Sequence, residues 1–300
     1  MGGAGVQFFF VLSGFLAGYS FSDETEIRTY YKKRMIRILP AYYVAVIGAM
    51  IFHYLVLKDV TTDSFGLGWL RYFFGLNTVL PSTNYDLWNN TYGLWTMSCF
   101  IWFYIMVPAI FRWVKSLNSA LYFFIATFIV SIGWKIGINS IFSRISDIES
   151  LDILTGASPF GVLYEFSIGI LVYFLLKEKK NFEGIILLSL VSICGIILGK
   201  NTFVWCALCG LMIIAFENIK INLSYKVQKY VYVLGRESFH VYLAHLLSFN
   251  IAWIISGNII RESNFLKYIV WMVISVISIL CFCCSMNFCE KKVASVLGKC

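Results

Sequence analysis

The chain has 300 residues, of which 59% are hydrophobic and 13% are charged, and its mean hydropathy is +0.77. Soluble domains carry about 25% charged residues, so this composition excludes a soluble globular protein and predicts an integral membrane protein. The net charge of +8 does not indicate nucleic-acid binding, because the basic residues lie beside apolar runs, where Lys and Arg mark the cytoplasmic ends of membrane spans.

Apolar segments long enough to cross a bilayer as helices, at about twenty residues each, recur along the whole chain. In chain order they are residues 2–21, 38–57, 92–114, 119–140, 159–177, 183–199, 201–218, 235–256 and 266–287. Residues 66–80 are too short and too interrupted for a span, and we expect them to lie at the interface or to re-enter. The predicted fold is an all-α, polytopic helical bundle of about nine spans, which forms a single domain over residues 1–300.

The charged residues predict how the spans are oriented. Most Lys and Arg residues fall in loops on one side, and the acidic segment 143–152 falls on the other. The positive-inside rule makes the basic side cytoplasmic and places the C-terminus there. Nine spans would then place Met1 outside, with no segment before the first helix to carry it across, so we expect a further helix upstream of Met1. A miscounted span is the alternative.

The first span contains Gly14 and Gly18, a pair four residues apart that lets another helix approach closely. Ser13 can bond back to its own helix or across to a neighbour. Helix packing in the membrane is the ordinary explanation for both features.

The segment RTYYKKRMIRILPAYY, residues 28–43, places Arg34 and Arg37 three residues apart, on one face of a helix that meets the bilayer just before Pro40. Two guanidinium groups on one face suit the binding of phosphates. An anchor in the lipid headgroups is the alternative for such a pair.

Later spans contain ionisable side chains, which are costly at membrane depth and by default functional. His245 lies well inside its span and is predicted to line a polar cavity. His240 lies nearer the interface and is predicted to be solvated or otherwise satisfied. Glu165 must be paired or face water, and a structural ion pair and a substrate contact are both open. Glu290 lies at a helix end and needs no special role.

Five short motifs follow one another along the chain. Their residues are Gly5, Val6, Phe9, Phe10, Ser13, Gly14 and Phe15; Arg34, Arg37, Pro40 and Tyr42; Trp95, Tyr104 and Pro108; Glu165, Phe166 and Gly169; and Gly235, Ser238, Phe239, Tyr242, Leu243 and His245. In this order and spacing they resemble the membrane acyltransferase family 3, the O-acyltransferases that decorate bacterial surface polysaccharides and related glycans.

The resemblance implies a ten-span fold whose first helix would precede Met1. It implies transfer of an acyl group, most simply acetyl, from acetyl-CoA or another acyl-CoA to a hydroxyl of a surface polysaccharide or its lipid-linked precursor. The implied location is a bacterial plasma membrane, with acyl-CoA, the glycan acceptor and membrane lipids as partners. No permanently bound cofactor, metal or nucleic acid is expected.

The resemblance also assigns roles to residues. Arg34 and Arg37 are the implied holders of the acyl donor. The residues expected to line a cavity or orient the substrate are Ser13, Trp95, Glu165, Tyr242 and His245. The family's catalytic histidine is expected upstream of Met1, so the catalytic base in this chain is unknown. His245 is a weak candidate, because its place in the family pattern fits a cavity-lining or substrate-orienting group better than the base.

One departure from the family pattern leaves other functions open. Many members carry a Glu a few residues beyond the motif Trp, where this chain has Phe100. A non-enzymatic exporter or glycan-lipid carrier on the same scaffold, or a truncated inactive acyltransferase, are therefore alternatives. The retained Arg34 and Arg37 oppose the carrier, because a carrier has no need of CoA.

Overall fold

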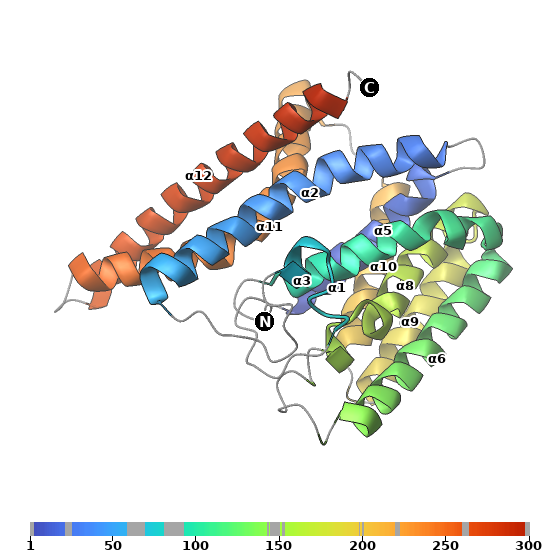
Figure 1. The fold of residues 1–300 in the computed structure, drawn as a ribbon. Coiled ribbons are helices and arrows are strands. Elements are labelled where there is room, and N and C mark those ends of the chain that lie inside the picture. The colour runs from blue at the N-terminus through green and yellow to red at the C-terminus, as the bar shows by residue number, and fades with distance from the viewer. Residues whose placement is uncertain are drawn as a thin grey trace. The chain divides into compact units, whose positions relative to one another are not determined.

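The computed structural model describes residues 3–21, 26–58, 70–80, 93–142, 144, 151, 154–197, 199, 201–219, 223–259 and 264–297. Within these ranges the regular secondary structure is entirely helical. The helices are α1 (Gly3–Ser20), α2 (Ile27–Ile51) with the π-helical η1 (Phe52–Leu57), α3 (Leu70–Phe73), α5 (Trp95–Trp113), α6 (Leu117–Phe142), α8 (Pro159–Lys177), α9 (Asn181–Ile197), α10 (Asn201–Asn218), α11 (Tyr225–Ile259) and α12 (Asn264–Leu297) (Figure 1).

The described helices confirm an all-α, polytopic membrane fold. Seven of them are long and apolar enough to cross a membrane, and two shorter apolar helices, Ala4–Ser20 and Asn181–Ile197, correspond to the other two predicted spans. Helices α8 and α10 have the predicted bounds. The bounds predicted for α2, α11 and α12 were too narrow, because hydropathy identifies only the part of a helix that lies in hydrocarbon, whereas these helices continue into charged sequence.

The segment predicted to lie at the interface or re-enter, residues 66–80, is described from residue 70 onward. It contains the single helical turn α3, whose backbone carbonyls accept hydrogen bonds from α2. Tyr42 Oη donates to the carbonyl of Tyr72 at 2.7 Å, and Tyr43 Oη donates to that of Phe73 at 3.0 Å. The acidic segment 143–152 lies almost entirely outside the described residues.

The helices form two compact units. The first unit comprises Met1–Tyr30 and Ser98–Asn222, and the second comprises Tyr31–Met97 and Leu223–Cys300. Two of the three boundaries along the chain fall inside α2 and α5, and the third falls between α10 and α11. That the whole chain acts as a single transmembrane domain stays a prediction.

Helix α8 is the centre of the first unit. Most of its residues are buried, and α1, α6 and α10 pack against it. The contact with α1 depends on glycine, because a Cβ on Gly14 would collide with the backbone carbonyl of Phe166, and a Cβ on Gly169 would collide with that of Val11. The predicted packing role of Gly14 is therefore confirmed.

Polar side chains fix the beginning of α8 and its register against α6. Ser158 caps the helix by accepting a hydrogen bond from the backbone N–H of Gly161 at 3.0 Å, and Pro159 occupies the first turn. Farther along, the hydroxyls of Thr127 and Ser167 lie 2.9 Å apart across the two helices. Such interhelical hydrogen bonds contribute to helix association in a bilayer, where hydrophobic burial supplies little.

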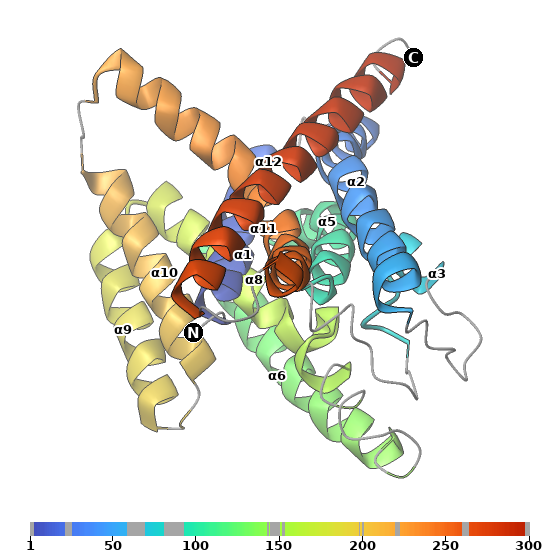
Figure 2. The same ribbon diagram turned by 90° about the vertical axis from the view of Figure 1, so that its left-hand side faces the viewer.

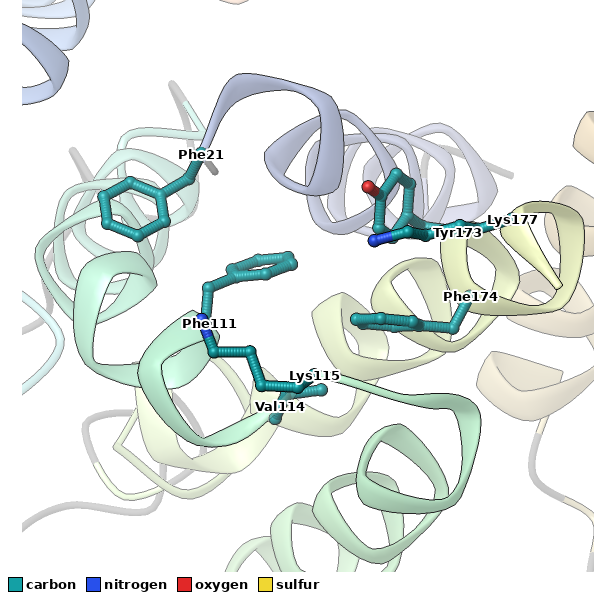
Figure 3. A pocket seen from close by; sticks show the side chains of 7 residues that line it. All are labelled: Phe21, Phe111, Val114, Lys115, Tyr173, Phe174 and Lys177. Carbon is teal, nitrogen blue, oxygen red and sulfur yellow. The ribbon is translucent and has the colours of Figure 1, made fainter. Parts of the chain in front are cut away.

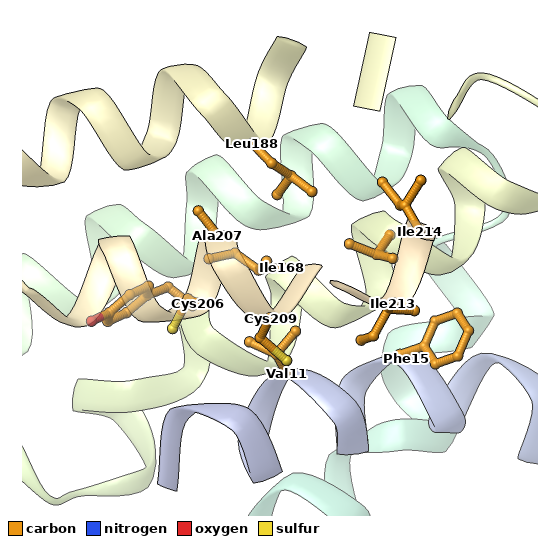
Figure 4. Packing of buried hydrophobic residues seen from close by; sticks show 11 residues of the cluster. Val11, Phe15, Ile168, Leu188, Cys206, Ala207, Cys209, Ile213 and Ile214 are labelled. Carbon is orange, nitrogen blue, oxygen red and sulfur yellow. The ribbon is translucent and has the colours of Figure 1, made fainter. Parts of the chain in front are cut away.

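An apolar cluster fills the space between α1, α8, α9 and α10 (Figure 4). Small side chains on α10, including Ala207 and Cys209, lie against larger ones on α1 and α8, so the helices approach closely. The buried members are Val11, Phe15, Tyr164, Ile168, Val172, Leu188, Cys206, Ala207, Cys209, Ile213 and Ile214.

The second unit is built on α2, α11 and α12 (Figure 2). Helices α11 and α12 pack side by side and run antiparallel, and Trp271 Nε1 donates to the carbonyl of Phe249 at 3.0 Å. Gly48 brings α2 close to both, because a Cβ there would lie 2.8 Å from the ring of Phe282 and 3.1 Å from Leu247. The three helices therefore hold the side chains described next in a fixed relation.

Candidate active site

Arg37 on α2 forms the centre of an ionic network in the second unit. Its Nη1 donates to both carboxylate oxygens of Glu290 on α12, at 3.0 and 3.3 Å, and its Nη2 donates to the backbone carbonyl of Arg236 on α11. The Arg37 side chain keeps 33% of its surface exposed, and that of Glu290 keeps 14%. The guanidinium group is therefore oriented by two other helices and still reaches solvent or ligand.

His240 on α11 completes the network from inside. Its side chain is fully buried, with Nε2 2.7 Å from Glu290 Oε1 and Nδ1 2.9 Å from Glu237 Oε2. A carboxylate can only accept a hydrogen bond, so both ring nitrogens donate, which describes the protonated imidazolium. His240 is satisfied rather than solvated, and it offers no lone pair to a substrate.

Glu237 is held by more than the histidine. Arg236 Nη2 lies 2.7 Å from its Oε1, and the side-chain amide of Asn287 donates to its Oε2 at 2.7 Å. Two carboxylates are thus surrounded by cations and hydrogen-bond donors from α2, α11 and α12, which compensates for their removal from water.

His245 lies one turn beyond His240 in a different setting. Its Nδ1 is 2.6 Å from the backbone carbonyl of Tyr242, so Nδ1 carries the proton and, in the neutral ring, Nε2 carries the lone pair. Among the residues that the structure describes, Nε2 has no hydrogen-bond partner. The ring is half-buried and lies 5.7 Å from the ring of Phe249. Of these two histidines, His245 is therefore the one that can accept a proton.

Tyr242 and Trp95 lie near the start of α5. Tyr242 Oη donates to Thr96 Oγ1 at 3.0 Å, and Thr96 Oγ1 donates to the carbonyl of Gly93 at 2.8 Å. Gly93 has φ of +64°, a conformation that favours glycine, and a Cβ there would lie 3.5 Å from Tyr242 Oη. Trp95 is the first residue of α5 and is half-buried.

The predicted residues Ser13 and Glu165 belong to the first unit. Ser13 is half-buried on α1, and its hydroxyl makes no hydrogen bond to any described residue. Glu165 on α8 is 2% exposed, and its Oε2 is buried without a hydrogen-bond partner among the described residues. An unsatisfied buried carboxylate oxygen is costly, which makes Glu165 a candidate for a ligand contact.

A family profile matches residues 1–288 and describes an acyltransferase domain, that of acyltransferase family 3. The chain belongs to this family. It is therefore a multi-pass membrane acyltransferase by family, as its motifs and its apolar helices predicted. No curated protein and no solved structure gave a significant match.

In this acyltransferase most of the predicted site residues lie in one of the two compact units, together with residues that were not predicted. Arg37, Tyr242 and His245 lie in the second unit, as do Arg34, which is half-buried on α2, and Trp95. The pairing of Glu290 with Arg37 could not be predicted from the sequence, because the two residues are 253 positions apart. The signal that the sequence did contain was the presence of acidic residues at the ends of two predicted spans, Glu237 in 235–256 and Glu290 just after 266–287.

The ionic network limits how the acyltransferase can use Arg37. A guanidinium group has five N–H donors in a fixed plane, and in Arg37 the Nη1 and Nη2 groups each already donate to a protein acceptor. The network fixes the orientation of the group, and the remaining donors and the positive charge can act on an anion. Arg34, one helical turn earlier, extends the same face of α2.

Proposed function

We propose that this acyltransferase moves an acyl group, most simply acetyl, from acyl-CoA to a hydroxyl of a surface polysaccharide or of its lipid-linked precursor. The geometry of His245 is the observation that carries the proposal. A hydroxyl becomes a nucleophile when a base accepts its proton, and a neutral imidazole with an uncommitted Nε2 is suited to that task near neutral pH. The contact of His245 Nδ1 with the carbonyl of Tyr242, which leaves Nε2 without a hydrogen-bond partner among the described residues, supports this role.

The donor is the second part of the proposal. Acyl-CoA carries phosphate groups, and Arg34 and Arg37 place two permanent cations on one face of α2. The contacts of Arg37 with Glu290 and with the carbonyl of Arg236 hold its guanidinium group in place before any ligand binds. This lowers the entropic cost of binding. This support is geometric and electrostatic, and it concerns binding rather than the chemical step.

Tyr242 and Glu165 have narrower proposed roles. Tyr242 precedes His245 by one turn, and its hydroxyl is fixed by Thr96, so it can help to orient an acceptor beside the base. Glu165 Oε2 can accept a hydrogen bond from a sugar hydroxyl, which would satisfy the buried oxygen. For Ser13 and Trp95 we propose only that they line a cavity that binds substrate.

The proposal is tested by acyl transfer in isolated membranes. Membranes containing the protein are supplied with acetyl-CoA that is radiolabelled in the acetyl group, and label is counted in polysaccharide and in lipid-linked glycan. An Arg34→Ala, Arg37→Ala variant is expected to lose most of the transfer while still inserting in the membrane.

The control variant is Lys33→Gln, which removes one charge from an exposed position on the same helix. It is expected to transfer as the unmodified protein does. Unchanged labelling in the double arginine variant, or an equal loss in Lys33→Gln, would refute the donor assignment.

A further inference from the structure

The ionic network of the second unit contains more positive than negative charge when its imidazole is protonated. Among the described residues its cations are Arg37, Arg236 and His240, and its anions are Glu237 and Glu290. Arg236 pairs with Glu237 at 2.7 Å. Arg37 and His240 share the other carboxylate, that of Glu290. The proton on His240 therefore decides whether the network carries a net positive charge or none.

His240 can act on a ligand only through its neighbours. Its side chain is fully buried, and its Nε2 and Nδ1 lie 2.7 Å from Glu290 Oε1 and 2.9 Å from Glu237 Oε2. A neutral imidazole has a proton on only one nitrogen, so the other nitrogen would direct a lone pair at a carboxylate oxygen. Loss of the proton thus removes one of these two hydrogen bonds as well as the charge.

The charged and titratable groups around His240 come from all three helices that meet here. Glu237 of α11 and Glu290 of α12 contact the ring directly, and Arg37 of α2 interacts with it electrostatically across Glu290. The groups that interact with Glu237 from its other sides are Arg236, Asn287 and the thiol of Cys283. The two carboxylates favour the imidazolium and Arg37 opposes it.

The proton on His240 changes what Arg37 offers to an anion. The Arg37 side chain keeps 33% of its surface exposed, whereas that of Glu290 keeps 14%. With His240 protonated, Glu290 is balanced from the buried side, and the excess positive charge is available at the exposed guanidinium group. With His240 neutral, Arg37 alone balances Glu290, and an approaching phosphate meets a neutral ion pair.

We propose that His240 is a positioning residue for the acyl donor, because its proton balances Glu290 and leaves the charge of Arg37 for the phosphates of acyl-CoA. The inference rests on the proposed role of Arg37 in donor binding. Since the proton and the donor are linked, each strengthens the binding of the other. Donor affinity is therefore higher when His240 is protonated, and it falls as the pH rises through the titration of the ring.

Calorimetric titration of the purified full chain in detergent with coenzyme A tests the proposal. Coenzyme A carries the phosphates but no acyl group to transfer. The measurements run from about pH 7 to about pH 9, where the ionisation of a phosphate changes little. In the unmodified protein the Kd for coenzyme A should rise by about tenfold, within the range of about 5- to 150-fold that is typical of coupled sites.

Two substitutions of His240 separate its charge from its packing. His240→Gln has no charge and should give the higher Kd at every pH. His240→Lys keeps a positive charge over the whole range and should give the lower Kd at every pH. The lysine variant and the unmodified protein suffice for the test if His240→Gln does not fold. A purely structural role would make the two substitutions alike.

Two control variants remove a histidine or a charge elsewhere. His245→Gln alters the histidine that contacts no carboxylate among the described residues, and the Kd should keep its pH dependence. Lys177→Gln alters a cavity of about 450 Å³ in the first unit, at the C-terminal ends of α1, α5 and α8 (Figure 3). This variant should bind coenzyme A as the unmodified protein does.

Several results would overturn the proposal while leaving Arg37 as a donor contact. They are a Kd that does not change with pH in the unmodified protein, a pH dependence that persists in His240→Lys, and an equal loss of affinity in His240→Gln and His240→Lys. A loss of affinity in Lys177→Gln that matches the loss in His240→Gln would also overturn it. Failure of the donor assignment itself is distinguishable, because Arg34→Ala, Arg37→Ala would then bind coenzyme A normally, and both proposals would be wrong.

Discussion

The imidazole of His240 on α11 and the carboxylate of Glu290 on α12, fifty positions apart in the chain, lie 2.7 Å from each other. The same carboxylate holds Arg37 of α2 at 3.0 Å, so one acidic side chain joins three helices of the second unit. The fully buried imidazole of His240 and the guanidinium group of Arg37 share one carboxylate and form a charged network with it. The cost of burying these charges is compensated only when all three groups are present.

Replacing Glu290 by glutamine should destabilise the second unit. The change keeps the shape of the side chain but removes the charge that Arg37 and His240 both contact. Hydrogen bonds to charged groups contribute about 1.5–3 kcal/mol each, so we expect a loss of about that size in the free energy of unfolding. Denaturation in detergent, followed by circular dichroism, measures it.

Glu183→Gln is the matched control for Glu290→Gln, because Glu183 is an exposed carboxylate in the first turn of α9. Its effect should stay within about 0.5 kcal/mol, as for most surface substitutions. If the two variants unfolded at the same denaturant concentration, the network would contribute nothing to stability.

Replacing Arg37 should weaken the binding of acyl-CoA more than replacing Glu290 does. If Arg37 only holds the helices together, Arg37→Ala and Glu290→Ala should change stability and acyl transfer alike. If Arg37 also contacts the donor, Arg37→Ala should raise the KM for acyl-CoA by a further factor of about ten, the value of one charge-assisted hydrogen bond of about 1.4 kcal/mol. The comparison requires initial rates over a range of acyl-CoA concentrations for both variants, and equal KM values would limit Arg37 to a structural role.

Much of the fold could be predicted from the sequence because the bilayer imposes a strong pattern. Long apolar runs located α8 and α10 to the residue, and the spacing of Gly14 and Gly18 predicted a close helix contact. Helix ends in charged sequence were missed, and α11 begins at Tyr225 rather than near residue 235, because hydropathy says nothing about a helix outside hydrocarbon.

The candidate site was less predictable, since its geometry depends on contacts between distant segments. The motif residues Arg37 and His245 could be named from the sequence, whereas the roles of His240 and Glu290 follow only from the packing of α2, α11 and α12. A histidine that donates from both nitrogens and one that keeps an acceptor look the same in a sequence. The division of the chain into two compact units likewise has little local signal, because two of its three boundaries fall inside α2 and α5.

A methyl group on Gly14 should separate α1 from α8. The added Cβ would meet the backbone carbonyl of Phe166, which cannot move aside as a flexible side chain could. Overpacking of this kind costs about 1–3 kcal/mol. Gly5→Ala on the same helix is the control, because nothing lies within 4 Å of a Cβ there, and it should be neutral or slightly stabilising. The two variants are compared by thermal unfolding in detergent. Equal midpoints would show that the close contact between α1 and α8 does not contribute to stability.

His245→Gln should abolish most of the acyl transfer while the protein stays folded. General base catalysis contributes about 10²- to 10⁴-fold, so kcat should fall by at least about a hundredfold with little change in the KM for acyl-CoA. His240→Gln should instead lower stability, since that ring is fully buried between two carboxylates. Measuring kcat and the unfolding midpoint for both variants separates the two effects. A folded His245→Gln protein with normal kcat would exclude this residue as the base.

Glu165→Gln should raise stability and lower activity. The carboxylate is 2% exposed, and its Oε2 has no hydrogen-bond partner within the described residues, so its burial opposes folding. A neutral amide costs less to bury, and we expect the free energy of unfolding to rise by about 1 kcal/mol or more.

If Glu165 accepts a hydrogen bond from the acceptor, the same variant should raise the KM for that acceptor at an unchanged KM for acyl-CoA. Such opposite changes are typical of a residue kept for function at the expense of stability. A variant that loses stability would instead indicate a structural ion pair, and the proposed acceptor contact would be wrong.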